Sequence, residues 1–383
     1  MPQPHKVILD QLRQLVATPS VSSTDPHWDQ GNRGVIELLE SWLSGMGFAT
    51  EIIDVQPNGT KANLIATLGS GPGGLVLAGH SDTVPFDEDR WQSDPLGLSE
   101  RDNRLYGLGS TDMKGFFPIA IAAASRYLDT PLKQPLILLA TADEESSMSG
   151  ARALAAAGRP RARAAIIGEP TSLVPVRMHK GIMMESVRVT GRAGHSSDPK
   201  LGNNALEGMH AVMGDLMAYR QSLQERYRND FFKVAWPTLN LGCIHGGDSP
   251  NRICGRADLH FDLRLTPGNY SDAVREEIAG RVSRIGTAHN LDIRLAPLIP
   301  SVEPFEQAAD SELVRIAEKL SGHRAEAVAF ATEAPFLKEL GMETIVMGPG
   351  SIDRAHQPDE YLELEQIQPC IELLSRCIEH YCL

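Results

Sequence analysis

Apolar and polar residues alternate along this chain in two different rhythms. In the first half, short apolar runs are separated by stretches in which apolar residues recur every three or four positions, as in amphipathic helices. Buried strands alternating with helices predict an α/β sheet that is mostly parallel. The runs are residues 64–68, 75–78, 136–141 and 165–168, and the helical stretches include 115–128 and 149–157.

The middle of the chain has a different pattern. Residues 183–190 alternate between apolar and polar side chains, as a strand with one buried face does. The segments that follow predict the order strand, helix, strand, strand, helix, strand of a ferredoxin-like α+β unit, over residues 183–190, 203–219, 238–244, 257–265, 271–288 and 291–295. The first rhythm then returns in 311–320, 344–347 and 364–381. We therefore expect one domain formed by residues 1–180 and 296–383, with residues 181–295 inserted as a second domain.

Composition narrows the range of partners. The chain has 383 residues, with 49 acidic and 36 basic side chains and a net charge of −13. An excess of acid argues against nucleic acid or an anionic membrane as partner, because both favour basic patches. The first twenty residues lack the apolar core of a secretory signal, and no apolar run is long enough to span a bilayer. Five cysteines without a C-x-x-C pair favour free thiols, so we expect a cytoplasmic protein.

Candidate metal ligands follow the predicted strands. His80 and Asp82 come directly after the run 75–78, and the Asp82 carboxylate is placed to hold the second nitrogen of the His80 ring. Glu144 and Glu145 follow 136–141, and Glu169 follows 165–168. In α/β sheets, the carboxyl ends of parallel strands form the edge where sites are built. Adjacent glutamates point apart, so one can bind metal while the other stays free as a base.

Two further candidates come from glycine-rich segments. Asp112 lies after Gly107–Gly109, and His356 follows Gly348–Gly350 near a fourth strand end. Each candidate has a simpler interpretation, because histidines and aspartates are common in turns and carboxylates are common at helix starts. Their joint placement on four strand ends nevertheless favours a metal site.

The motif series Gly79–Pro85, Gly107–Gly115, Asp143–Glu145 and Gly168–Pro170 resembles that of the di-zinc aminoacylase/carboxypeptidase-type amidohydrolases. The resemblance covers essentially the whole chain, in order. Within that superfamily, further segments are similar to the bacterial branch that deacetylates acetylornithine, namely residues 140–145, 167–172, 194–199, 238–242 and 348–361. We see no departure at a metal or catalytic position.

The resemblance implies a zinc-hydrolase domain with two Zn²⁺ ions per subunit, for which Co²⁺ can substitute. One ion would be held by His80, Asp112 and Glu169. The other would be held by Asp112, Glu145 and His356, so that Asp112 bridges. Glu144 would act as the base with Asp82 in a supporting catalytic role. The family's bridging aspartate precedes a cis peptide bond, and Asp112-Met113 occupies that place.

The resemblance also implies that the inserted domain is a lid through which the protein forms a homodimer. His195 would then reach the partner's active site, and Asn251 and Arg264 would bind the substrate carboxylate, with His179 and Lys180 as weaker candidates. An arginine suits this task because its planar fork binds both oxygens. The alternatives are a surface charge for Arg264 and a loop histidine that caps Ser196 and Ser197 for His195.

The activity implied is hydrolysis of a small N-acetyl amino acid, N2-acetyl-L-ornithine, to L-ornithine and acetate in arginine biosynthesis. Its side-chain ammonium calls for an acid, for which Glu333 is a candidate, although a helix-start carboxylate explains it equally well. A sister amidohydrolase would instead act on N-acetylcitrulline, other N-acyl amino acids, a dipeptide or N-succinyl-diaminopimelate. A binding protein without activity would have lost Glu144 or a ligand, and neither is lost.

Overall fold

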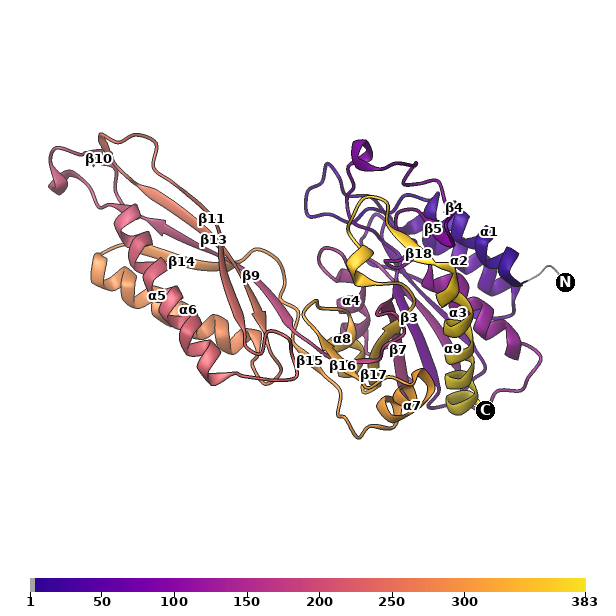
Figure 1. Cartoon of the computed structure of the whole chain (residues 1–383). Helices are drawn as coiled ribbons and strands as arrows, with labels where there is room; N and C mark the ends of the chain where they lie inside the picture. Colours follow the sequence, from indigo (N-terminus) through magenta and orange to yellow (C-terminus); the bar gives the residue numbers. More distant parts are fainter. Residues whose placement is uncertain (1–3) are drawn as a thin grey trace. The chain divides into compact units, whose positions relative to one another are not determined.

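A computed structural model describes residues 4–383, which divide into two compact units (Figure 1). Unit 1 contains the chain up to Arg177 together with Gln307–Glu326 and Thr332–Leu383. Unit 2 contains Met178–Glu306 and Ala327–Ala331. Three short strands lie where the chain passes from one unit to the other, and they are β8 (Val176–His179), β15 (Phe305–Glu306) and β16 (Glu326–Val328).

The centre of unit 1 is a sheet in which four parallel strands are neighbours. In the order β6-β3-β7-β17, they are Leu136–Thr141, Leu75–His80, Ala164–Pro170 and Glu343–Gly348. All their residues are buried except Glu343, which fits their nearly unbroken apolar sequences. The predicted, mostly parallel α/β sheet is therefore confirmed. Beside β6 the sheet continues with antiparallel β2 (Ala62–Leu68) and β1 (Ala49–Asp54).

Helices pack on both faces of this sheet, with α3 and α9 on one side and α4 and α8 on the other (Figure 1). The helices of unit 1 are α1 (Pro4–Val16), α2 (Arg33–Gly45), α3 (Phe116–Ala124), α4 (Ser149–Ala157), α7 (Glu312–Ser321), α8 (Ala334–Glu339) and α9 (Ile367–Cys382). Helix α9 buries three cysteines among its apolar residues, Cys370, Cys377 and Cys382. All five cysteines are free, and Cys243 is the exposed one. None of the helices between residues 4 and 383 combines the length and apolarity needed to cross a bilayer.

A small sheet brings two loops of unit 1 together. Strand β5 (Arg104–Tyr106) pairs with β4 (Ser99–Arg101) and, on its other side, with β18 (Tyr361–Glu363). The loop that leads from β5 to Asp112 therefore lies beside the segment that leads from His356 to β18. Strands of three residues carry too little pattern to be predicted from sequence, and these were not.

Unit 2 has the predicted order of six elements. They are β9 (Gly181–Thr190), α5 (Ala205–Arg226), β11 (Thr238–Gly246), β13 (Arg256–Leu265), α6 (Ser271–His289) and β14 (Asp292–Pro297). The strands form an antiparallel sheet in the order β11-β13-β9-β14. One face is packed against α5 and α6, and alternate residues of β9 and β13 are accordingly buried. A separate ribbon pairs β10 (Gly194–His195) with β12 (Arg252–Ile253).

Candidate metal centre

The carboxyl edge of the parallel strands in unit 1 gathers the predicted ligands. His80 is the last residue of β3, Glu169 lies near the end of β7, and Glu145 follows β6. His356 comes from the segment after β17, and Asp112 comes from the loop between β5 and α3. Because the four strands are parallel neighbours, their ends meet at one edge, and the structure brings all five side chains together there.

Asp112 lies between the two histidines. Its Oδ1 atom is 3.0 Å from Nε2 of His80, and its Oδ2 atom is 3.2 Å from Nε2 of His356. Glu145 Oε1 is 3.0 Å from the same His356 nitrogen. Each Asp112 oxygen therefore faces a different imidazole, which is the arrangement that a ligand bridging two cations requires.

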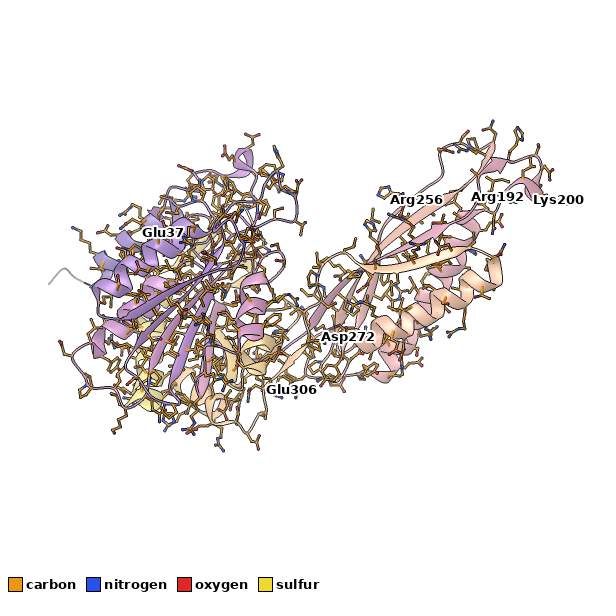
Figure 2. All side chains as sticks on the ribbon, turned by 180° about the vertical axis from the view of Figure 1, so that it is seen from behind. Glu37, Arg192, Lys200, Arg256, Asp272 and Glu306 are labelled. Atoms are coloured by element: carbon orange, nitrogen blue, oxygen red, sulfur yellow. The ribbon has the colours of Figure 1, made fainter. Side chains whose placement is uncertain are left out.

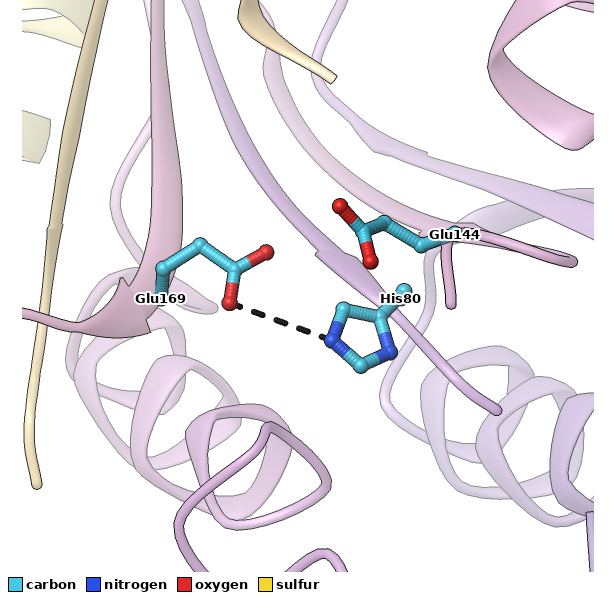
Figure 3. A group of neighbouring side chains, drawn as sticks. All are labelled: His80, Glu144 and Glu169. Atoms are coloured by element: carbon cyan, nitrogen blue, oxygen red, sulfur yellow. Dashed lines mark ion pairs between the residues drawn. The ribbon is translucent and has the colours of Figure 1, made fainter. Parts of the chain in front are cut away.

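Glu144 and Glu169 approach His80 from two sides (Figure 3). Glu169 Oε2 lies 3.8 Å from His80 Nε2, and ligand atoms of His80, Glu144 and Glu169 all lie within 4.8 Å of one another. His80, Asp112 and Glu145 form a second such group. The His356 side chain is 51% exposed, whereas that of His80 is buried, so the centre has one face open to solvent.

The two ring nitrogens of His80 have different surroundings, and Nε2 is the one that faces the carboxylates of the centre. The Nδ1–H of His80 donates to the backbone carbonyl oxygen of Asp82 at 3.0 Å, because a carbonyl can only accept. The other ring nitrogen, Nε2, therefore faces the oxygens of Asp112 and Glu169. Acceptors at this distance repel unless a proton or a metal ion lies between them.

The charges of the centre also call for cations. Burial raises the pKa of Glu144 and of Glu169, and the neighbouring carboxylates raise both further. Burial alone would raise the pKa of Asp112, but hydrogen bonds from His356 and His80 hold it well below its usual range. The Glu169 Oε1 atom is buried and has no hydrogen-bond partner among residues 4–383. Imidazole and carboxylate donors with unmet charge fit zinc or a similar divalent ion.

Asp82 contacts Nδ1 of the His80 ring, as the sequence suggested, but the ring's hydrogen bond goes to the backbone carbonyl of Asp82. Its carboxylate is 3.7 Å from His80 Nδ1, which bonds instead to the carbonyl of the same residue. The carboxylate accepts from the backbone N–H groups of Glu144, at 3.3 Å, and Glu145, at 3.1 Å. Burial raises the pKa of Asp82 to about 6. The chain turns directly after β3, so that the backbone carbonyl of Asp82 faces the His80 ring. The Asp82 carboxylate then contacts the segment that carries both glutamates.

Sequence reasoning missed Glu360, which supports Asp112. Its carboxylate accepts from the backbone N–H groups of Gly109 at 3.1 Å, Thr111 at 2.8 Å and Asp112 at 2.9 Å. Burial raises its pKa to about 8. The sequence feature that could have identified Glu360 was its position four residues after the predicted ligand His356. The Asp112-Met113 peptide bond is cis, as the resemblance implied.

Unit 2 holds the three predicted substrate-binding residues at two separate places. His195 lies on β10, and its Nδ1 accepts from the Ser197 N–H at 3.2 Å. Asn251 is beside it, because its carbonyl accepts from Ser196 N–H at 3.1 Å. Arg264 lies near the far end of β13, where it bonds to Asp262 at 3.0 Å. At about 3.3 Å per residue, Arg264 is roughly 26 Å along β13 from the His195 end, which Arg256 marks in Figure 2.

Three weaker candidates are buried inside their own units. Glu333 is 1% exposed at the start of α8, and it accepts from Thr141 Oγ1 at 2.8 Å. Burial raises its pKa to about 7. In unit 2, His179 packs on Phe305, and Lys180 Nζ donates to the carbonyl of Trp236 at 2.6 Å. These contacts support a structural role for all three.

A carboxylate and histidine cluster at the edge of such a sheet defines a metal-dependent hydrolase, and comparison gives the family. Residues 76–380 match the model of Peptidase family M20/M25/M40, and the chain belongs to this family. The resemblance to this superfamily of hydrolases is thereby confirmed, and the protein is an amidohydrolase.

Curated relatives narrow the group. The chain is 48% identical over 374 residues to the acetylornithine deacetylase of Pasteurella multocida, covering 98% of both chains. It is 49% identical over 370 residues to that of Edwardsiella ictaluri, covering 97% of this chain and 96% of the relative.

Solved structures share the fold at lower identity. A metallo-carboxypeptidase of the M20 family from Sulfolobus solfataricus superposes with a TM-score of 0.73 at 18% identity, over 97% of this chain and 98% of the other. A dinuclear metal-binding M20 peptidase from Bacillus subtilis has a TM-score of 0.70 at 14% identity, over 98% and 97%.

Proposed function

We propose that this protein hydrolyses N2-acetyl-L-ornithine to L-ornithine and acetate, as a cytoplasmic step of arginine biosynthesis. The observation that carries the proposal is the near-half identity to acetylornithine deacetylases along almost the whole of both chains. The metal centre supports it, because the proposed metal ligands and the proposed base all lie at one edge of the sheet. The five free cysteines agree with a reducing compartment.

Two zinc ions would occupy the centre, with cobalt as a substitute. His80, Asp112 and Glu169 would hold one ion, and Asp112, Glu145 and His356 would hold the other. When bound, such ions polarise a carbonyl oxygen and lower the pKa of a water to near neutrality. The open face beside His356 is where substrate would enter.

Glu144 would move the proton. Its carboxylate faces His80 and lies within 4.8 Å of ligand atoms of His80 and Glu169 (Figure 3). It belongs to neither of the two ligand sets proposed above, so it would remain free to accept a proton from the attacking water. It would then give that proton to the departing amine, first base and then acid. Burial and neighbouring carboxylates, which raise its pKa, suit a group that must both take and release a proton near neutral pH. Asp82 would keep Glu144 in place through the backbone.

Residues of unit 2 would complete the site from two subunits. Arg264 and Asn251 would bind the substrate carboxylate, and His195 would donate to the developing oxyanion. The acceptor role of His195 Nδ1 toward Ser197 supports this, because the neutral ring then carries its proton on Nε2. Arg264 lies roughly 26 Å along β13 from the end of the strand near the other two, which argues that one chain does not bring all three to one substrate.

The exposed edge of β11 would form the homodimer. β11 is an outer strand of the unit 2 sheet, and residues 242–246 are all exposed, including Ile244 at 47%. A long edge strand with exposed apolar side chains is a template for pairing with another chain. A second copy of β11 would pair with the unpaired backbone N–H and C=O groups of this edge and so extend the sheet. Ile244→Asp should yield monomers in analytical ultracentrifugation, whereas Ile244→Thr should keep the dimer.

A substrate screen tests the proposed activity. Purified protein with added zinc or cobalt should release acetate from N2-acetyl-L-ornithine faster than from N-acetylcitrulline or N-acetylmethionine. It should not act on N-succinyl-diaminopimelate, whose extra carboxylate needs a second cationic clamp. Glu144→Gln serves as the control for contaminating hydrolases. Preference for N-acetylcitrulline would replace this proposal with the sister activity.

A further inference from the structure

Unit 1 contains a buried cation that the mechanism above does not use. Lys61 directly precedes β2, and its side chain is 5% exposed. Its Nζ atom donates to Oδ1 of Asp143 at 2.5 Å and to Oδ1 of Asp29 at 2.7 Å. A lysine is rarely buried unless it is paired, so this position carries a specific task.

Asp143 is the residue immediately before Glu144, and it closes the loop that carries both glutamates. Its backbone oxygen accepts from the N–H groups of Ser147 at 3.1 Å and Met148 at 2.6 Å. Its carboxylate also accepts from Ser22 Oγ at 2.9 Å and from Ser149 Oγ at 2.5 Å. Asp143 is thus both the hinge of the loop and its anchor to the rest of unit 1.

The charge of this anchor depends on Lys61. The Asp143 side chain is 5% exposed, and of the groups that donate to it only Lys61 carries a full positive charge. A buried carboxylate that loses its cation is strongly destabilised. The Asp143 backbone also has a φ of +60°, a conformation that is uncommon for residues other than glycine, although aspartate adopts it more readily than most. Without the ion pair, the loop would relax toward a commoner conformation.

We propose that Lys61 is a positioning residue for hydrolysis, which acts through Asp143 to hold Glu144 and Glu145 in register with the other ligands. The loop then has two independent attachments. Asp82 binds the backbone N–H groups of the two glutamates, and Lys61 binds the side chain that precedes them. The inference rests on the proposed roles of Glu144 as base and Glu145 as ligand.

Replacing the lysine tests the proposal through the ratio of kcat to KM effects. Lys61→Met keeps the length of the side chain and removes the charge, so kcat should fall by about 10–100-fold while KM changes little. Lys61→Arg should recover much of that loss, because the charge returns. Asp29→Asn is the matched control, since it removes the other partner of the same lysine and leaves the loop anchored. Wild-type kcat in a folded, metal-loaded Lys61→Met enzyme would overturn the proposal.

Hydrogen exchange of the metal-free protein gives a readout that needs no substrate. In Lys61→Met, the amides of residues 144–148 should exchange faster, whereas those of β9 in unit 2 should not change. Should wild-type protein prove inactive on every N-acyl amino acid, the proposed function fails while this measurement still judges the role of Lys61. Unchanged protection of residues 144–148 would show that the lysine does not hold the loop.

A paired substitution separates positioning from general stability. In Lys61→Met combined with Asp143→Asn, no charge remains buried without a partner, so the double variant should fold and recover kcat relative to Lys61→Met. If the single variant does not fold, the double variant carries the test. Failure of the double variant to fold would mean that Lys61 supports the whole of unit 1, and the positioning role would be wrong.

Discussion

The two units of this protein distribute their functional residues in opposite ways. In unit 1, residues from five segments far apart in sequence meet at one edge of a sheet, with atoms as close as 3.0 Å. In unit 2, His195 and Arg264 lie at opposite ends of the sheet, although they belong to the same small domain. A parallel sheet collects its strand ends on one edge, whereas an antiparallel sheet sends successive ends to opposite edges. Unit 1 thus gathers its candidate ligands at one place, whereas unit 2 keeps its candidate substrate-binding residues apart.

The largest effect in unit 1 is expected when Glu144, the proposed base, is replaced. Glu144→Gln keeps the shape of the side chain and removes proton transfer, so kcat should fall by roughly two to four orders of magnitude. The metal content measured by elemental analysis should stay at the wild-type level, because Glu144 is not among the proposed ligands. An enzyme that turns over at the wild-type rate would remove Glu144 from the mechanism.

The corresponding test of unit 2 is the loss of His195. Removing one donor to an oxyanion typically costs about 10²–10³-fold in turnover, and His195→Ala should fall in that range. Mixing this variant with Glu144→Gln, after dissociation and re-pairing, should restore part of the activity. One site of each mixed dimer then keeps its own Glu144 and receives His195 from its partner. Mixed dimers that stay as inactive as their parents would show that His195 does not act across the interface.

A substitution of Asp82 tests one of the two attachments of the loop that carries Glu144 and Glu145. Asp82→Ala removes the acceptor for the Glu144 and Glu145 N–H groups, and activity should fall by about 10–100-fold. Because the His80 ring bonds to the backbone carbonyl of residue 82, that hydrogen bond survives the substitution. The affinity of His80, Asp112 and Glu169 for their ion, measured by zinc titration, should therefore change less than kcat does. A loss of zinc affinity larger than the loss of kcat would show that the Asp82 carboxylate supports His80 as a ligand.

The smallest effect is expected on the surface of unit 2. Arg226 and Glu277 join α5 to α6 through two hydrogen bonds of 3.0 and 2.9 Å, and both side chains are about two-fifths exposed. An exposed ion pair contributes about 0.2–1 kcal/mol, so Arg226→Gln should lower the free energy of unfolding by no more than that. Urea denaturation measures it. A far larger loss would mean that the helix pair depends on this contact rather than on its apolar core.

Sequence predicts this molecule best where chemistry follows a regular element. The parallel strands have long apolar runs that end at His80, Glu144 and Glu169, so both the sheet and the edge that carries the ligands follow from the pattern. Strand β1 was missed because it is half exposed and carries Thr50 and Glu51 among its apolar residues.

Long-range hydrogen bonds were not predictable. Glu360 meets Asp112 only because β18 pairs with β5, and Lys61 meets Asp143 only because β2 lies beside β6. The direction of the Asp82 carboxylate depends on a single turn after β3, which no periodicity describes. The separation of His195 from Arg264 follows from strand order, and the sequence gives elements without giving their neighbours.

The placement of the cysteines allows selective chemical labelling of the protein at a single thiol. Four of the five thiols are buried, and burial raises the pKa of Cys370, Cys377 and Cys382 further from the reactive thiolate form. A maleimide dye would therefore attach at Cys243 on the exposed edge of β11 without any engineered mutation. Because pairing of two β11 edges would cover Cys243, the rate of labelling should fall as the protein assembles, so assembly could be followed on the unmodified sequence.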